Sequence, residues 1–149
     1  MSERKHKRAT RNRKPAKTGA LQRRLDEALA SEAATAEILK VIASSPSDAQ
    51  PVFDAIVRST LRLVGGHSAI VLRIADDMLH LAAHSSTSAS GDDALRRFYP
   101  RPIDSVMLHG RGIRSRRPYC VADTEKVPAS MRDVEEMARE RGYRSVMVV

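Results

Sequence analysis

Two pairs of side chains in this sequence are of types that can do chemistry, and the first is His80 with His84. Histidines four residues apart suit a zinc ion on a helix, but on a strand the same spacing leaves them about 13 Å apart, too far for one metal. The residues around them alternate in polarity as in a strand, and no acidic residue of an HExxH motif lies between them. We therefore predict solvent-facing histidines and no metal site.

The second pair is Cys120 with His109, which together would supply a nucleophile and a base. Nothing in the sequence indicates a third group that orients the base, or donors for an oxyanion. We therefore expect a buried, unreactive thiol at position 120. Because Cys120 is the single cysteine of the chain, intrachain disulfides and cysteine-clustered zinc sites are excluded, as is chemistry that needs two thiols.

Glycine and arginine residues follow His109 in a pattern that could suggest a phosphate site. The segment Gly110-Arg111-Gly112 nevertheless matches neither the dinucleotide-binding pattern nor the P-loop pattern. The nearby basic cluster is expected to be a solvated turn, and it consists of Arg114, Arg116 and Arg117.

The positive charge of the chain is concentrated at one end. The 149 residues carry a formal charge of +8, and residues 1–17 alone hold eight Lys or Arg against one acidic residue. Such a segment can bind nucleic acid non-specifically by releasing counterions, so a basic-tailed nucleic-acid-binding protein is the alternative function. The chain has no apolar run of membrane-spanning length and no secretory signal, which leads us to expect a cytoplasmic protein.

The first half of the chain divides into a tail and two helices. Residues 1–18 have no hydrophobic periodicity and are predicted to be a disordered basic tail. A long helix is predicted over residues 20–43, within a helical linker at 19–45. Its apolar side chains recur at three- and four-residue steps, in a seam that also includes Glu32 and Thr35. The seam indicates a weak coiled coil, parallel to a second copy, through Leu21, Leu25, Leu39 and Ile42. The alternative is a helix that simply lies on its own domain.

The remaining elements follow from hydrophobic periodicity and from turn residues. A helix is predicted at 48–64, with Asp48 as its N-cap and Gly65-Gly66 at its end. The other expected elements are two strands of a hairpin at 68–74 and 78–84, a loop at 85–90, a helix at 92–99, a helix at 106–115, a strand at 119–122, a helix at 130–141 and a strand at 144–149.

Three short motifs of the ordered part resemble those of a known family. They are the helix entry SSPSDAQPVFDAIV, the segment RRPYCVAD and the turn GYRSV. Together they resemble the GAF domains of bacterial sensor histidine kinases and nucleotide cyclases, over roughly residues 35–149. The NKFDE-type signature of the members that bind cyclic nucleotides is absent.

The resemblance implies an α+β fold: a GAF/PAS-like antiparallel sheet of five or six strands, flanked by helices and preceded by a signalling-type helix. It implies that 46–149 form the GAF-like domain and that its last strands are missing, so that a strand following Val149 would lie between the first hairpin and the strand at 144–149.

The resemblance also implies a function. GAF domains are sensory or regulatory modules of signal-transduction proteins, which bind a small ligand or dimerise and have no catalytic activity or cofactor of their own. The family's ligand lies between the sheet and the segment 95–123. The candidate ligand-binding residues are therefore Phe98, Tyr99, Val106, Met107, His109 and Tyr119, and the alternative is that these six side chains simply fill the core.

Overall fold

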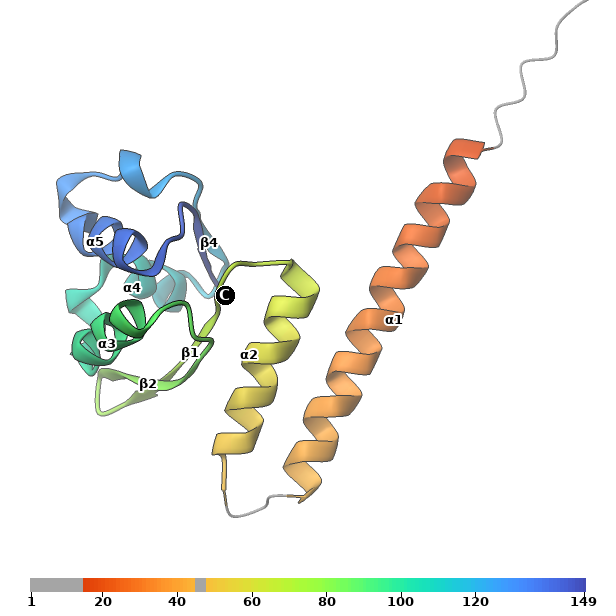
Figure 1. The fold of residues 1–149 in the computed structure, drawn as a ribbon, viewed down its shortest axis with the longest axis horizontal. Helices are drawn as coiled ribbons and strands as arrows, with labels where there is room; N and C mark the ends of the chain where they lie inside the picture. The colour runs from red at the N-terminus through yellow and green to blue at the C-terminus, as the bar shows by residue number, and fades with distance from the viewer. Residues whose placement is uncertain (1–14, 45–47) are drawn as a thin grey trace, which may run out of the picture.

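A computed structural model describes residues 15–44 and 48–149 as an α+β fold, which confirms the predicted fold class (Figure 1). The helices are α1 (Pro15–Ser44), α2 (Gln50–Val64), α3 (Ala89–Phe98), α4 (Met107–Ser115) and α5 (Arg132–Arg141). The strands are β1 (Ile70–Ala75), β2 (Met78–His84), β3 (Arg101–Pro102), β4 (Tyr119–Val121) and β5 (Val146–Val148). Short 3-10 helices occupy Ile103–Ser105, Thr124–Lys126 and Ala129–Met131. No helix in this described part is both long and apolar enough to cross a membrane.

The described strands form two small antiparallel sheets rather than the single sheet that the resemblance implies. One sheet has the order β1-β2-β3 and the other consists of β4 and β5. The predicted hairpin is confirmed: β1 and β2 are joined by Asp76 and Asp77, whose positive φ angles of 51° and 59° form a tight two-residue turn. The short strand β3 was not predicted from the sequence, because Pro100 and Pro102 indicated only the end of a helix.

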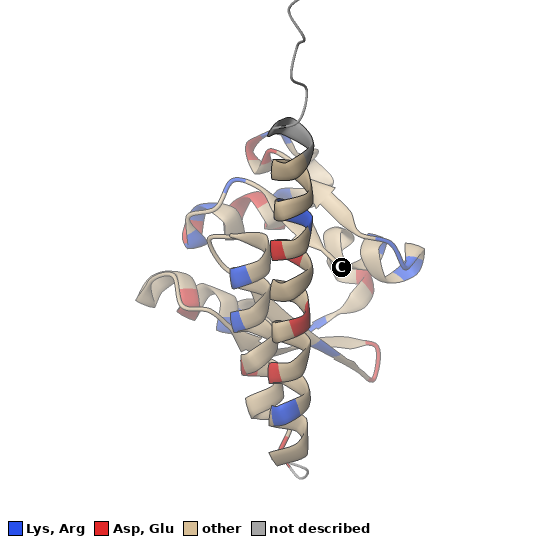
Figure 2. Ribbon diagram, turned by 90° about the vertical axis from the view of Figure 1, so that its right-hand side faces the viewer, with Lys and Arg blue, Asp and Glu red and all other residues tan. Residues whose placement is uncertain are grey.

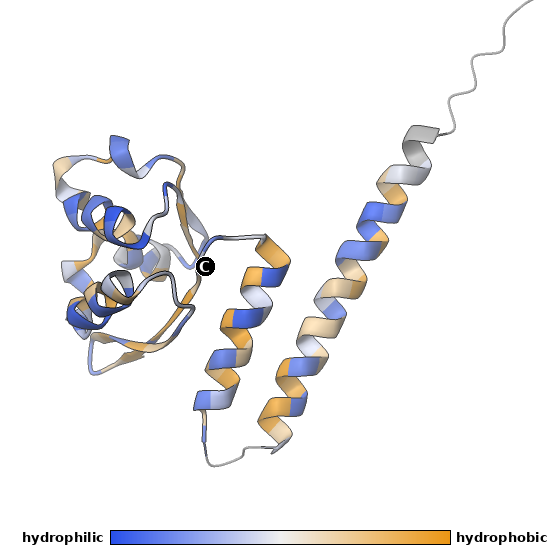
Figure 3. Ribbon diagram, in the orientation of Figure 1, coloured by the Kyte–Doolittle hydropathy of each residue, from blue (hydrophilic) through white to orange (hydrophobic). Residues whose placement is uncertain are grey.

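Helices cover both faces of the β1–β2 hairpin. α2 packs on one face, and on the other α3 and the start of α4 form a core around Leu79, Leu95, Tyr99 and Val106. A second core lies between α4, α5 and the β4–β5 sheet, and its buried residues are Leu108, Met131 and Val134. The molecule therefore has two adjacent hydrophobic cores, and hydrophobic residues recur along the elements that line them (Figure 3).

The ends of α2 largely match the sequence analysis. Its C-terminus is confirmed at Gly65, which adopts a left-handed conformation with φ of 64° and donates its N–H to Leu61 O. The N-cap is Ala49, so the prediction of Asp48 as cap is wrong by one residue. The Asp48 carboxylate instead accepts a hydrogen bond of 2.9 Å from the backbone N–H of Gln50.

α3 begins three residues earlier than predicted. Ser88 is its N-cap and accepts a 3.0 Å hydrogen bond from the N–H of Gly91, so part of the expected loop at 85–90 is helical. The first residue of α3 could not be predicted from the sequence, because several serines and a threonine around position 88 are equally good N-caps. The elements predicted at 106–115, 119–122, 130–141 and 144–149 are confirmed to within two residues at either end.

α1 starts at Pro15, so residues 15–18 belong to the helix and their assignment to a disordered tail is wrong. Residues 1–14, which carry most of the basic tail, lie outside the described residues. α1 packs against α2, with Ala34 only 3% exposed at the contact. Glu37 reaches Arg62 at 3.0 Å and Arg58 at 3.9 Å across the same contact. The N-terminal half of α1 extends beyond the rest of the molecule, and charged residues of both signs are spaced along the helix (Figures 1 and 2).

A buried ion pair joins α3 to α5. The Arg141 side chain is 1% exposed, and its guanidinium donates to Asp92 Oδ1 at 3.0 Å, to Gly91 O at 3.3 Å and to Ser85 O at 2.8 Å. The hydroxyl of Ser86 and the N–H of Thr87 donate to the carboxylate of Asp92. These hydrogen bonds, led by that from Ser86, hold the pKa of Asp92 at about 2, below its ordinary value of 3.8.

We predict that Asp92→Asn destabilises the protein far more than Asp93→Asn, because only Asp92 neutralises a buried guanidinium, whereas Asp93 pairs on the surface with Arg96. Urea unfolding at pH 7 measures the difference. Because folding lowers the pKa of Asp92, its contribution is present above pH 4 and is lost as the pH falls through 3.8 towards 2. The Asp92→Asn protein should lack this part of the acid transition, and equal unfolding midpoints for the two variants would contradict the prediction.

Candidate functional site

The six candidate ligand-binding residues are divided between the two cores. Tyr99 and Val106 are buried in the first core, and Phe98 packs at its edge. Met107 and Tyr119 pack at the edge of the second core. His109 lies in contact with Tyr99. The structure therefore brings Phe98, Tyr99, Val106 and His109 together at the first core, and it places Met107 and Tyr119 at the second.

Tyr99 and His109 form a titratable pair at the first core, in which Tyr99 is buried and His109 is half-buried. The Tyr99 hydroxyl lies 3.3 Å from His109 Nε2, and the two rings meet edge to face with centroids 6.1 Å apart. Phe98 extends the cluster, with its ring centroid 5.0 Å from that of Tyr99. His109 Nδ1 is buried and has no hydrogen-bond partner among the described residues.

Burial sets the protonation states of this pair. It lowers the pKa of His109 to about 4 and raises the pKa of the Tyr99 hydroxyl, to which nearby Tyr143 and Asp133 contribute. Both rings are therefore neutral near pH 7. A neutral imidazole can accept a proton, but this one is half-buried against Tyr99 rather than exposed at the surface. The arrangement suits core packing, or contact with a ligand that enters the core, better than proton transfer at a surface.

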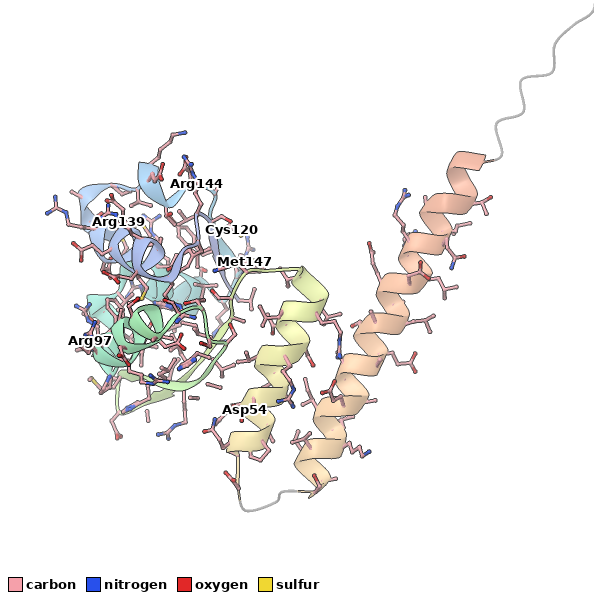
Figure 4. The ribbon with its side chains drawn as sticks, in the orientation of Figure 1. Asp54, Arg97, Cys120, Arg139, Arg144 and Met147 are labelled. Atoms are coloured by element: carbon pink, nitrogen blue, oxygen red, sulfur yellow. The ribbon has the colours of Figure 1, made fainter. Side chains whose placement is uncertain are left out.

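Two grooves lie on the surface around α5, away from most of the candidate residues. The first, of about 360 Å³, runs between α3 and α5 and includes Phe98 and Met137 among charged residues. The second, of about 370 Å³, lies between α5 and the 3-10 helix Thr124–Lys126 and is bordered by Tyr143, whose pKa burial raises to about 12. Of the six candidates, Phe98 alone lines either groove. Arg97 and Arg139 extend from the outer side of α3 and α5 (Figure 4).

The other residues considered for chemistry do not come together. His80 and His84 lie on strand β2, as predicted, but both are half-buried rather than solvent-facing, and Nδ1 of His84 is buried. No cluster of metal-ligating side chains occurs among the described residues. Cys120 is exposed, so the expectation of a buried thiol is wrong. It lies on β4 opposite Met147 of β5, on the sheet face away from the second core (Figure 4). Arg114, in the basic cluster, pairs with Asp104 at 2.5 Å.

The residues predicted for dimerisation are all exposed. The large side chains along α1 retain much of their accessible surface: Leu21 66%, Leu25 52%, Leu29 53%, Leu39 60% and Ile42 48%. Residues of α1 that contact α2 lie on the opposite side of the helix, around Ala34. Such a row of exposed leucines on one helix is unusual for a helix that only covers its own core.

No protein-family model matches the chain, and comparison with curated proteins finds no relative. The resemblance to GAF domains therefore rests on the motifs of the sequence alone.

We predict that the folded protein is destabilised as His109 becomes protonated. Burial keeps the pKa of His109 at about 4 against 6.5 in the unfolded chain, so the unfolded state binds the proton first. The free energy of unfolding should therefore decrease by about 3 kcal/mol between pH 6.5 and pH 4. Denaturant titrations at stepped pH measure this decrease. It should disappear in His109→Gln and persist in Tyr99→Phe, and an NMR titration of the His109 ring near pH 6.5 would contradict it.

The exposure of Cys120 gives a second expected result. Because the thiol lies on the open face of β4, a thiol-specific reagent such as Ellman's reagent should modify one cysteine per chain without denaturant. The Cys120→Ser protein should show no reaction. If the reagent modifies Cys120 only after the protein is unfolded, the thiol is buried, as the sequence analysis expects.

Proposed function

We propose that this chain is a cytoplasmic GAF-type sensory or regulatory module of a signal-transduction protein, which acts without catalysis of its own and associates with a second copy through α1. The observation that carries the proposal is the row of exposed apolar residues along α1, on the side that α2 leaves uncovered. Enzymatic chemistry has no comparable support, because the described nucleophile, base and metal-ligand candidates do not meet.

The energetics favour a weak, reversible association. Burying a leucine completely is worth about 1.5–3 kcal/mol, so each half-exposed leucine of α1 would contribute about 1 kcal/mol on association. Association itself costs several kcal/mol of translational and rotational freedom. A helix pair of this composition therefore responds to modest changes in the attached domain, which suits a regulatory module.

The small-ligand part of the proposal depends on the core cluster of Phe98, Tyr99 and His109. This cluster combines aromatic surface with one buried, unpartnered nitrogen, a combination that can orient a small polar ligand. The cluster lies where α3 ends and α4 begins, so a ligand that separates these helices would also change the first core.

We predict that Leu25→Gln/Leu39→Gln converts the protein to monomer. The substitutions remove four apolar side chains from a dimer interface, worth about 4 kcal/mol, so the dimer Kd should increase more than 100-fold. Sedimentation equilibrium over a range of concentrations measures this Kd.

The matched control is Ala33→Gln/Lys40→Gln, which changes two exposed positions of α1 outside the apolar row. Its Kd should stay within a few-fold of that of the unmodified protein, and circular dichroism should show both variants folded. A protein that is monomeric before any substitution, or a dimer that persists in Leu25→Gln/Leu39→Gln, would refute association through α1.

A further inference from the structure

Two opposite faces of α1 differ in what covers them. The face toward α2 includes Ala30, Ala34, Ile38 and Val41, which are buried or half-buried. The opposite face follows alternating four- and three-residue steps, the spacing of coiled-coil core positions, and each of its seven residues is exposed. We call this face the α1 seam, and it consists of Leu21, Leu25, Ala28, Glu32, Thr35, Leu39 and Ile42.

The centre of the α1 seam is polar. Glu32 and Thr35 occupy two consecutive core positions, whereas the positions on either side are apolar. A polar residue at a coiled-coil core position specifies the orientation and register of the partner at some cost in stability. The position of Glu32 and Thr35 should therefore select among the ways in which a second seam can bind.

On the basis of the self-association proposed above, we propose that a second copy of α1 binds the seam in an antiparallel orientation, with Glu32 opposite Thr35 of the partner subunit. The same register places Leu25 opposite Ile42 of the partner subunit and Leu39 opposite Ala28 of the partner subunit. Each of these contacts occurs twice around the two-fold axis. Polar residues thus face polar residues, and apolar residues face apolar residues.

The parallel orientation that the sequence analysis predicts lacks this complementarity. In a parallel pair with matched register, each core residue faces its own copy, so Glu32 would face Glu32 of the partner subunit inside the interface. Two like charges held together away from water repel strongly. The antiparallel pair avoids this repulsion, because it places Glu32 opposite Thr35 of the partner subunit and keeps the apolar seam residues opposite one another.

The register is also specific among antiparallel arrangements. A shift of seven residues in one direction places Leu25 opposite Thr35 of the partner subunit, and a shift in the other direction places Glu32 opposite Ile42 of the partner subunit. Either shift buries a polar group against an apolar one. In the described structure the Thr35 hydroxyl donates to Ser31 O at 3.0 Å, and rotation about one bond would direct it to the carboxylate of Glu32 of the partner subunit.

Disulfide cross-linking tests the orientation, in a Cys120→Ser background so that the introduced thiol is the single one. Cysteines link when their Cα atoms lie within about 7 Å. Two separately tagged proteins, Leu25→Cys and Ile42→Cys, should cross-link when mixed and oxidised, and neither should link to itself, because like positions lie about 25 Å apart along the antiparallel pair. Asp26→Cys, an exposed position outside the seam, is the matched control and should give no link.

Charge substitutions at Thr35 give an independent measurement by sedimentation equilibrium. Thr35→Glu places a second carboxylate opposite Glu32 of the partner subunit and should weaken the dimer at least about tenfold, whereas Thr35→Lys creates an ion pair there and should keep or tighten it. In a parallel dimer Thr35→Lys would instead face its own copy and weaken association.

The outcomes separate this inference from the proposed function. Self-linking of Leu25→Cys, or weakening by Thr35→Lys, would overturn the antiparallel orientation while leaving self-association intact. A protein that stays monomeric at every concentration would refute the proposed self-association, and the inference with it. Cross-linking of the mixed pair together with a tight Thr35→Lys dimer would support both.

Discussion

The ion pair between Arg141 and Asp92 connects the part of the molecule built around the first core to the part built around the second core. Asp92 lies in the first turn of α3, which covers β1 and β2, and Arg141 ends α5, which covers the second core. A guanidinium that is 1% exposed must find acceptors inside the protein, and here α3 and the turn before it supply all of them. Gly91 permits the close approach, because a Cβ there would lie 2.9 Å from Glu140 O. The relative position of the two cores therefore depends on this contact.

Local patterns predicted the elements well, and long-range contacts could not be predicted in the same way. The apolar stripe of α2, its glycine C-cap and the alternation of β1 and β2 are properties of neighbouring residues, so they are visible in the sequence. The ion pair of Asp92 with Arg141 joins positions 49 residues apart, and the residues next to each of them in the sequence do not indicate the other as its partner. The division of the described strands into two sheets likewise depends on packing rather than on the pattern within any strand.

The errors at the candidate site have a simple geometric cause. Alternate residues of a strand face opposite sides, so Tyr119 and Val121 at the second core direct Cys120 between them toward solvent. Val106 is the extended N-cap residue before α4 and enters the first core, whereas Met107 is the first residue of the helix and borders the second. The six candidates, which the resemblance places between the sheet and the segment 95–123, are therefore distributed over two cores. The alternation rule applied to β4 alone would have corrected the expectation for Cys120.

The position of α2 gives the proposed dimer a physical connection to the rest of the molecule. α2 lies between α1 and the β1–β2 hairpin: Glu37 of α1 pairs with Arg62 of α2, and Gln50 of α2 donates to Ala82 O of β2 at 3.0 Å. Because α1 contacts α2 through small residues such as Ala34, the two helices can slide only by breaking close contacts. A change at the first core that displaces β2 would therefore displace α2 together with α1, and would change the angle between α1 and the α1 of the partner subunit. In the proposed dimer, the angle between these two helices determines whether the two seams remain in contact along their length.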